Sequence, residues 1–186
     1  MIVRELHERG HEIGSHDILH DNRLCWLTDE QLEQRLRRAR EMVEPYDGIG
    51  FRSPSLFRDA RLIQAIGRHF DYDSSLCDTD VEFRRGCTSV FPYRLRGCLE
   101  LPVTLPMDSS LTYIGYGAQK ILRTWQEKCS YIRAAGGLAV SVTHAEPHLT
   151  GGRKLMGTLR NFLAWAKGQD DCTILLPSQL TRNWTE

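Results

Sequence analysis

Two histidines near the N-terminus have the residue type and spacing of metal ligands. His16 and His20 stand four residues apart in the run GHEIGSHDILH, which extends from Gly10 to His20. On a helical turn this spacing puts both imidazoles on one face, close enough to bind one ion, and neutral imidazole is the commonest metal ligand among side chains. The same spacing also occurs among ordinary surface or packing histidines, so the rest of the chain must decide between these two interpretations.

A second histidine motif overlaps the first. The segment from His7 to His11 reads HERGH, which matches the HExxH pattern of zinc proteases, and Gly14 and Asp17 extend it toward the longer metzincin pattern. In that pattern two histidines on one helix bind zinc and the glutamate is the general base. Gly10 is expected to end the helix between the two ligands, few residues precede His7, and no clear Met-turn follows. A metzincin-like zinc protease is therefore the less favoured alternative.

The elements that must position these side chains alternate between helices and strands. Hydrophobic periodicity, caps and stop residues predict helices at about 2–9, 28–43, 59–67, 117–134 and 155–167, and strands at about 11–14, 50–52, 72–73, 98–103, 138–143 and 173–176. Such alternation is typical of a parallel sheet, open or closed into a barrel. The first element is a helix that leads into a strand, whereas a βα unit begins with its strand, so we expect that a first strand is missing.

Length, charge and cysteine usage limit the classes of function. The 186 residues fit a single domain, 1–186, and their 24 basic and 24 acidic side chains give no net charge that would attract nucleic acid. No apolar run is long enough to span a bilayer, and no secretory signal is visible. The six scattered cysteines form no CxxC pair. They are expected to be packing residues in a reducing compartment, which favours a cytoplasmic location unless an export signal belongs to the missing segment.

Four segments, in order along the chain, resemble signatures of the polysaccharide deacetylases, the NodB-homology or carbohydrate esterase family 4 group. GHEIGSHDILH resembles their second signature, whose two metal-binding histidines fall on His16 and His20. The run FRSP at 51–54 resembles their arginine–proline signature, and LELPVTLPMD at 99–108 resembles a run found in one branch of these enzymes. VTHAEPH at 142–148 resembles the last signature, a strand that ends in the catalytic histidine.

The resemblance implies an α/β fold, a distorted and incomplete (β/α) barrel of the polysaccharide deacetylase type. It implies a metal-dependent hydrolase that removes acetyl groups from N-acetylated oligo- or polysaccharides by cleaving a non-peptide carbon–nitrogen bond. The metal ligands would be His16 and His20, with zinc favoured and cobalt or another divalent transition metal as alternatives. His144 would be the general acid and Arg52 would orient the catalytic base. We therefore expect His16, Arg52 and His144 to converge at the C-terminal side of the strands.

One departure from the family pattern bears on activity. The first signature, an Asp-Asp pair that supplies the base and the third metal ligand, has no counterpart in this chain. This agrees with the missing first strand and predicts a poor or inactive deacetylase, because general-base assistance contributes roughly 10²–10⁴ in rate. Asp17 and Asp21 flank the histidines and are candidate replacements for the third ligand. Asp108 is a candidate helix cap or a candidate lining residue of the site, and the structural role is favoured.

A non-catalytic relative is the alternative from another class of function. Such a protein would bind saccharides without cleaving them, in a cleft lined by aromatic side chains. The candidates for this lining are Trp26, Tyr93, Tyr113 and Tyr116.

Overall fold

The computed structural model describes residues 2–79 and 86–184, which divide into two compact units. The first unit contains Met1–Leu76, Pro92–Leu101 and Leu175–Glu186, and the second contains Cys77–Phe91 and Pro102–Ile174. The chain leaves the first unit and re-enters it, so segments that are far apart in the sequence build one sheet and one core. The assignment of the whole chain to a single domain stays a prediction.

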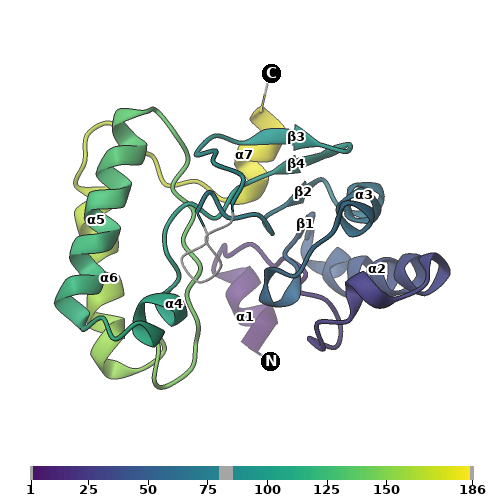
Figure 1. Ribbon diagram of the computed structural model, residues 1–186, viewed down its shortest axis with the longest axis horizontal. Coiled ribbons are helices and arrows are strands. Elements are labelled where there is room, and N and C mark those ends of the chain that lie inside the picture. Colours follow the sequence, from purple (N-terminus) through teal and green to yellow (C-terminus); the bar gives the residue numbers. More distant parts are fainter. Residues whose placement is uncertain (1, 80–85, 185–186) are drawn as a thin grey trace. The chain divides into compact units, whose positions relative to one another are not determined.

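The first unit holds a four-stranded sheet (Figure 1). Its order is β1 (Gly50–Phe51), β2 (Tyr72–Asp73), β4 (Cys98–Glu100) and β3 (Tyr93–Leu95). The pairs β1–β2 and β2–β4 are parallel, and β3 is antiparallel to β4. The expected α/β class with an incomplete barrel is thus confirmed, since this sheet is open. The carboxyl ends of three parallel strands meet at one edge, where the chain continues into Arg52, Ser74 and Leu101.

Helices flank this sheet within the first unit. They are α1 (Ile2–Glu8), α2 (Asp29–Val43), α3 (Ala60–His69) and α7 (Pro177–Asn183), with short 3₁₀ turns η1 (Leu24–Trp26), η2 (Glu44–Tyr46) and η3 (Pro54–Leu56). As predicted, α2 begins with a capping box. The Thr28 hydroxyl accepts from Gln31 N, and the Gln31 side chain accepts from Thr28 N. The side chain of Asp59 caps α3 by accepting from Leu62 N.

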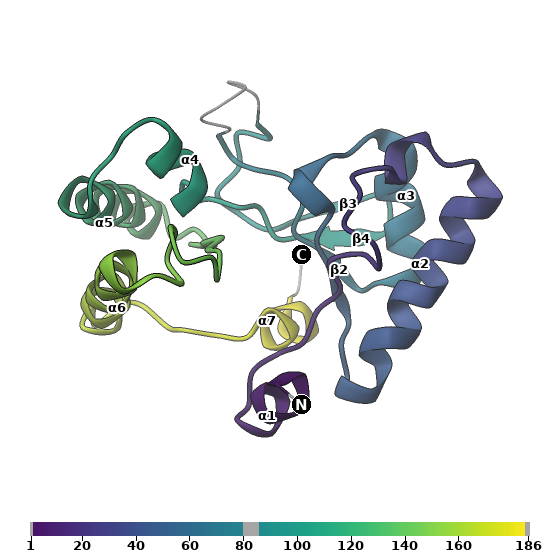
Figure 2. The same ribbon diagram turned by 90° about the horizontal axis from the view of Figure 1, so that it is seen from below.

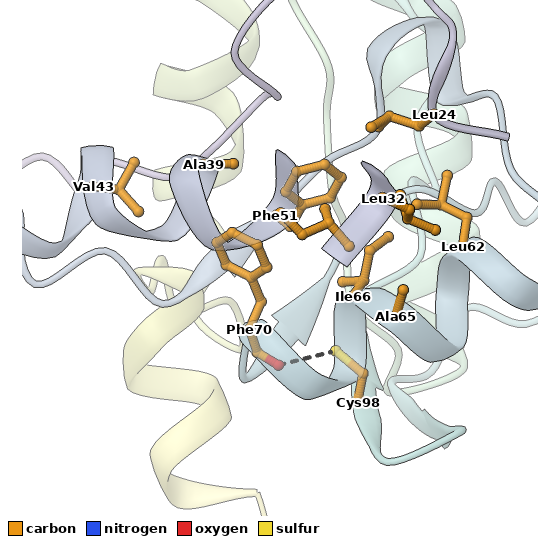
Figure 3. Packing of buried hydrophobic residues seen from close by; sticks show 11 residues of the cluster. Leu24, Leu32, Ala39, Val43, Phe51, Leu62, Ala65, Ile66, Phe70 and Cys98 are labelled. Carbon is orange, nitrogen blue, oxygen red and sulfur yellow. Dashed lines mark hydrogen bonds between the residues drawn. The ribbon is translucent and has the colours of Figure 1, made fainter. Parts of the chain in front are cut away.

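The core of the first unit lies between α2, α3 and the sheet (Figure 3). Because the apolar residues of both helices recur every three or four positions, each helix buries one face and leaves the other to charged side chains. Phe51 from β1 and Phe70 after α3 meet in this core with ring centroids 5.0 Å apart. The thiol of Cys98 donates to the Phe70 carbonyl oxygen. The core therefore holds β1 and β4, the strands that lead into the candidate site.

The described part of the second unit contains three helices: α4 (Asp108–Tyr113), α5 (Ala118–Ala134) and α6 (Arg153–Lys167). Helices α5 and α6 lie side by side, as Figures 1 and 2 both show. Trp125 of α5 is fully buried, packs on Phe162 of α6 and donates from Nε1 to the Pro106 carbonyl oxygen at 2.7 Å. This contact fixes the segment that leads into α4. Among the described residues, no helix is both long and apolar enough to cross a membrane.

The strands expected at about 11–14, 138–143 and 173–176 are wrong, because these segments contain no strand. Near 138–143 the hydroxyl of Thr104 forms hydrogen bonds with two backbone groups that would pair with a neighbouring strand in a regular sheet. It donates to the Leu138 carbonyl oxygen and accepts from Val140 N, so a regular ladder does not form. Near 11–14, Ser15 forms an isolated parallel bridge with Phe51 instead of a strand.

Candidate functional site

The first unit brings the two predicted metal-binding histidines together. The rings of His16 and His20 have centroids 4.8 Å apart and meet edge to face at 70°. Zinc–nitrogen bonds are about 2.0–2.1 Å long, so two imidazoles at this separation are close enough to reach one ion. The donor set of two neutral nitrogens therefore fits part of a zinc or cobalt site.

The local structure that pairs these histidines is a loop, not the helical turn that we expected. Residues 11–23 contain no helix. Asp17 and His20 have positive φ angles of 65° and 49°. Two left-handed residues fold the loop back on itself and return His20 to His16. The spacing thus predicted the proximity of the rings but the wrong backbone.

His16 is oriented by the backbone of the residue that resembles the family arginine. Its Nδ1 lies 2.8 Å from the carbonyl oxygen of Arg52, which can only accept, so Nδ1 carries the proton and Nε2 keeps its lone pair. Partial burial lowers the pKa of His16 below 6.5. The hydrogen bond to Arg52 and the negative charge of Asp17 oppose this effect, and the nearby His20 ring and Arg52 guanidinium add to it. His16 is therefore neutral at neutral pH, as a metal ligand must be.

Asp17 and Asp21 are bound to an arginine of α2. Arg35 donates from Nε to Asp17 Oδ1 at 2.8 Å and from Nη2 to Asp21 Oδ1 at 2.6 Å, and Nη2 also pairs with Asp17 Oδ2. The side chain of Asp17 has no solvent exposure. Arg35 thus engages both carboxylates that the sequence suggested as third ligands, and their role as ligands stays a prediction. No group of three or more His, Cys, Asp or Glu side chains suited to a metal occurs in the described part of the chain.

The side chain of Arg52 docks on the turn that follows β2. Its Nε donates to the Ser74 carbonyl oxygen at 2.8 Å, and Nη2 donates to Ser74 Oγ at 2.7 Å. Ser74 Oγ in turn donates to the carbonyl oxygen of Leu101 after β4. The arginine therefore joins the ends of the three parallel strands, and its backbone carbonyl holds His16.

Two buried carboxyl groups lie under this turn, and the sequence analysis missed them. Asp73 and Glu100 are register partners on β2 and β4, with 1 % and 0 % exposure. Asp73 Oδ1 accepts from Ser74 N and Ser75 Oγ. Burial raises the pKa of Asp73 to about 6, although these hydrogen bonds, Arg52 and a hydrogen bond with Glu100 oppose the rise. If both groups were ionised, two negative charges would lie on neighbouring strands in the buried interior, so the site favours a proton on Asp73.

The second unit holds the predicted general acid, His144, in contact with Asp108. His144 Nδ1 lies 2.5 Å from Asp108 Oδ1, and Asp108 Oδ2 accepts from His144 N and from the backbone and hydroxyl of Thr150. Burial raises the pKa of Asp108, but the hydrogen bonds from Thr150 and His144 outweigh it and hold the pKa below its ordinary value. Asp108 is therefore ionised, and it fixes His144 with a proton on Nδ1 and with Nε2 directed elsewhere.

The expected role of Asp108 as a helix cap is wrong. The N-cap of α4 is Met107, and Asp108 is the first helical residue, with a side chain that has no solvent exposure. A histidine and an aspartate 36 positions apart give no sequence signal for this contact. Whether His144 converges with His16 and Arg52 stays a prediction.

The HExxH segment does not form the helix that a zinc protease needs. Helix α1 ends at Glu8, and Gly10 has a φ of 84°. His7 lies on the helix and His11 lies beyond it, and the His7 ring packs edge-on against Tyr46 with centroids 5.6 Å apart. The glycine that ends α1 therefore separates the two histidines of this motif.

The aromatic residues proposed for a saccharide cleft occur in both units. In the first unit, Trp26 is 68 % exposed and its ring lies against that of Phe57, with centroids 5.7 Å apart. In the second unit, Tyr113 is 85 % exposed. Tyr116 and His148 line a cavity of about 180 Å³ in the second unit. Each of these surfaces remains a candidate for sugar contact.

Comparison with known proteins identifies the fold. No protein-family model and no curated protein sequence matches this chain. A solved structure described as a polysaccharide deacetylase from Mycobacterium smegmatis matches 97 % of this chain and 65 % of its own, with 24 % identity and a TM-score of 0.76. A second solved structure, described as a polysaccharide deacetylase from Pseudomonas aeruginosa PAO1, matches 98 % of this chain and 62 % of its own, with 19 % identity and a TM-score of 0.73.

A third similar structure is Puue allantoinase, which matches 98 % of this chain and 62 % of its own, with 19 % identity and a TM-score of 0.71. The chain thus has a polysaccharide deacetylase-like fold, as the sequence motifs predicted. It spans 62–65 % of the length of these three solved chains.

Proposed function

We propose that this chain is a metal-dependent hydrolase of the deacetylase type, which removes acetyl groups from N-acetylated saccharides. The observation that supports it best is the pairing of His16 with His20, in which the Arg52 carbonyl leaves Nε2 of His16 available to a metal. The fold shared with two polysaccharide deacetylases supports the class of reaction. The identity of the sugar and of the metal belongs to the proposal.

In this proposal His16 and His20 hold a divalent ion, with zinc favoured and cobalt as the alternative. When bound, such an ion activates a water molecule and polarises the acetyl carbonyl group. His16 contributes Nε2, because its Nδ1 is engaged by Arg52. The guanidinium of Arg52 keeps that carbonyl in place through its hydrogen bonds to Ser74.

His144 gives the proton that the leaving amine needs when the carbon–nitrogen bond breaks. Its Nδ1 is held by the Asp108 carboxylate, so Nε2 is the atom that transfers the proton. The negative charge of Asp108 stabilises the imidazolium form that is the proton donor. The amine then departs neutral, and the imidazole is left neutral.

This proposal assigns no residue to the role of general base. The carboxylates next to the histidines, Asp17 and Asp21, are bound to Arg35. We therefore expect turnover by this 186-residue chain to be slow, by roughly the 10²–10⁴ that a general base contributes. The same observation supports the second candidate function, a saccharide-binding relative that does not cleave its ligand.

An assay of the full chain with cobalt or zinc on a chitin oligosaccharide tests the proposal, with release of acetate as the readout. Slow, metal-dependent release that His144→Ala abolishes is the expected result. Allantoin is the second substrate, because an allantoinase shares the fold. If the chain hydrolyses allantoin but releases no acetate from the saccharide, the substrate class in the proposal must change to a cyclic amide. Saccharide binding without acetate release, with zinc and with cobalt, would support the non-catalytic alternative.

A further inference from the structure

One side chain connects helix α2 to the loop at residues 11–23, which contains His16 and His20 and is called the two-histidine loop. Arg35 points from α2 into the loop and engages the carboxylates of Asp17 and Asp21 with Nε, Nη1 and Nη2. Asp17 lies between His16 and His20 in the sequence, and Asp21 follows His20 directly. The guanidinium therefore binds one carboxylate that precedes His20 in the sequence and one that follows it.

These groups are placed where breaking the contact is unfavourable. The Arg35 side chain is 9 % exposed and that of Asp17 is fully buried. Hydrogen bonds to the two carboxylates raise the pKa of Arg35, in spite of its burial, so the guanidinium keeps its charge. If the loop moved Asp17 away, it would leave a buried charge without its partner, which is strongly disfavoured.

The loop needs such support because its backbone is unfavourable by itself. Asp17, His20 and Asn22 all have positive φ angles. Asp, His and Asn adopt this region more readily than other non-glycine residues, but they still populate it rarely, so three such residues in one loop gain from a contact that holds them there. A planar guanidinium is suited to the task, because its five donors have a fixed geometry that binds two carboxylates at once.

We propose that Arg35 is a positioning residue for the two-histidine site: by binding Asp17 and Asp21 it sets the loop conformation that brings His16 and His20 together. The role in metal binding rests on the proposed function, whereas the effect on the loop does not. A consequence is that Asp17 and Asp21 serve as partners of Arg35 and leave the metal to the imidazoles. Arg35 itself touches neither the metal nor the substrate.

The test compares Arg35→Met and Arg35→Lys with Arg68→Met in the full chain. Arg68 of α3 pairs with Glu33 of α2 in an exposed contact, so Arg68→Met removes an arginine–carboxylate pair from the same helix and leaves the loop intact. The first readout is the set of nuclear Overhauser effects between the His16 and His20 rings in the metal-free protein. The second is the dissociation constant and visible spectrum of Co²⁺.

We expect Arg35→Met to lose the ring-to-ring effects and to bind Co²⁺ at least about tenfold more weakly, within the range seen when residues that orient ligands are lost. Arg35→Lys should show an intermediate effect, and Arg68→Met should match the unmodified chain. Retained ring contacts in folded Arg35→Met would overturn the proposal.

Two further outcomes remain informative. If Arg35→Met does not fold, Arg35→Lys and Asp21→Ala decide, because each leaves part of the contact in place. Weakened ring contacts in both would support the proposal, and unchanged contacts in both would overturn it. If the unmodified chain binds no Co²⁺ but Arg35→Met still loses the ring contacts, the proposed metal site fails and the positioning role of Arg35 stands.

Discussion

His144 Nδ1 lies 2.5 Å from Oδ1 of Asp108, a carboxylate without solvent exposure. Asp108 also accepts three hydrogen bonds on Oδ2, from His144 N and from N and Oγ1 of Thr150. This carboxylate therefore fixes the ring, the backbone and the loop of the proposed acid at the same time. The arrangement links the stability of the second unit to the chemistry of His144.

Asp108→Ala should lower both stability and activity. Each buried donor left without an acceptor costs on the order of 1–3 kcal/mol, so a clear fall in the melting temperature is expected. Acetate release should fall by roughly 10²-fold or more, since the proton donor loses its orientation. Asp171→Asn is the matched control, because Asp171 is 67 % exposed and pairs with Arg133 at the surface. An unchanged melting temperature in Asp108→Ala would contradict this view of the contact.

The raised pKa of the buried Asp73 should make the stability of the chain depend on pH. Burial raises the pKa of Asp73 from 3.8 to about 6 in the folded state. The folded chain therefore binds this proton more tightly than the unfolded chain, and the contribution to stability is complete below about pH 4 and is lost as pH rises through 6. The charged groups next to Asp73 are Glu100 and Arg52, and Cys98 lies close by.

Asp73→Asn resembles the protonated form and should remove this dependence. Urea unfolding at several pH values would measure it. Relative to Asp73→Asn, the unmodified chain should lose stability between about pH 4 and 6, by at most about 1.4 kcal/mol per pH unit for one proton. A difference that is constant over this range would show that Asp73 does not keep a proton in the folded chain.

Gly50 should not tolerate a side chain. A Cβ atom at this position of β1 would lie 1.8 Å from Cζ of Tyr72 on the neighbouring strand. Gly50→Ala should therefore destabilise the chain by roughly 1–3 kcal/mol through overpacking. Gly157→Ala, within α6 and with no atom within 4 Å of the added Cβ, should stabilise it by about 0.5–1 kcal/mol. Chemical denaturation of both variants measures the two changes in the free energy of unfolding. Equal changes in the two variants would contradict the prediction.

The helices could be predicted because their signals are local. The capping box of Thr28 and Gln31 lies within one helical turn, and the apolar face of α3 lies within one helix, so the sequence alone places them. The hairpin of β3 and β4 was missed, although its turn residues Arg96 and Gly97 both have positive φ angles, as a type I′ hairpin turn requires. The dipeptide Arg-Gly is a weaker turn signal than Asn-Gly, and the strands around it are short.

The candidate site could be predicted only in part. The proximity of His16 and His20 follows from their spacing, but their left-handed loop depends on Arg35, a residue of another element. The contact of Asp108 with His144 and that of Asp73 with Glu100 depend on how distant segments align. No periodicity within one segment carries that information.

The direct test of the central claim is the number of zinc or cobalt ions bound per chain, measured by equilibrium dialysis in four proteins. We predict that the unmodified chain binds one ion, that His16→Ala and His20→Ala each abolish binding, and that His7→Ala leaves it nearly unchanged. His7 is the matched control because it belongs to the HExxH segment and packs against Tyr46. Loss of the ion in His7→Ala, with binding retained in His16→Ala, would contradict the assignment of the metal to His16 and His20.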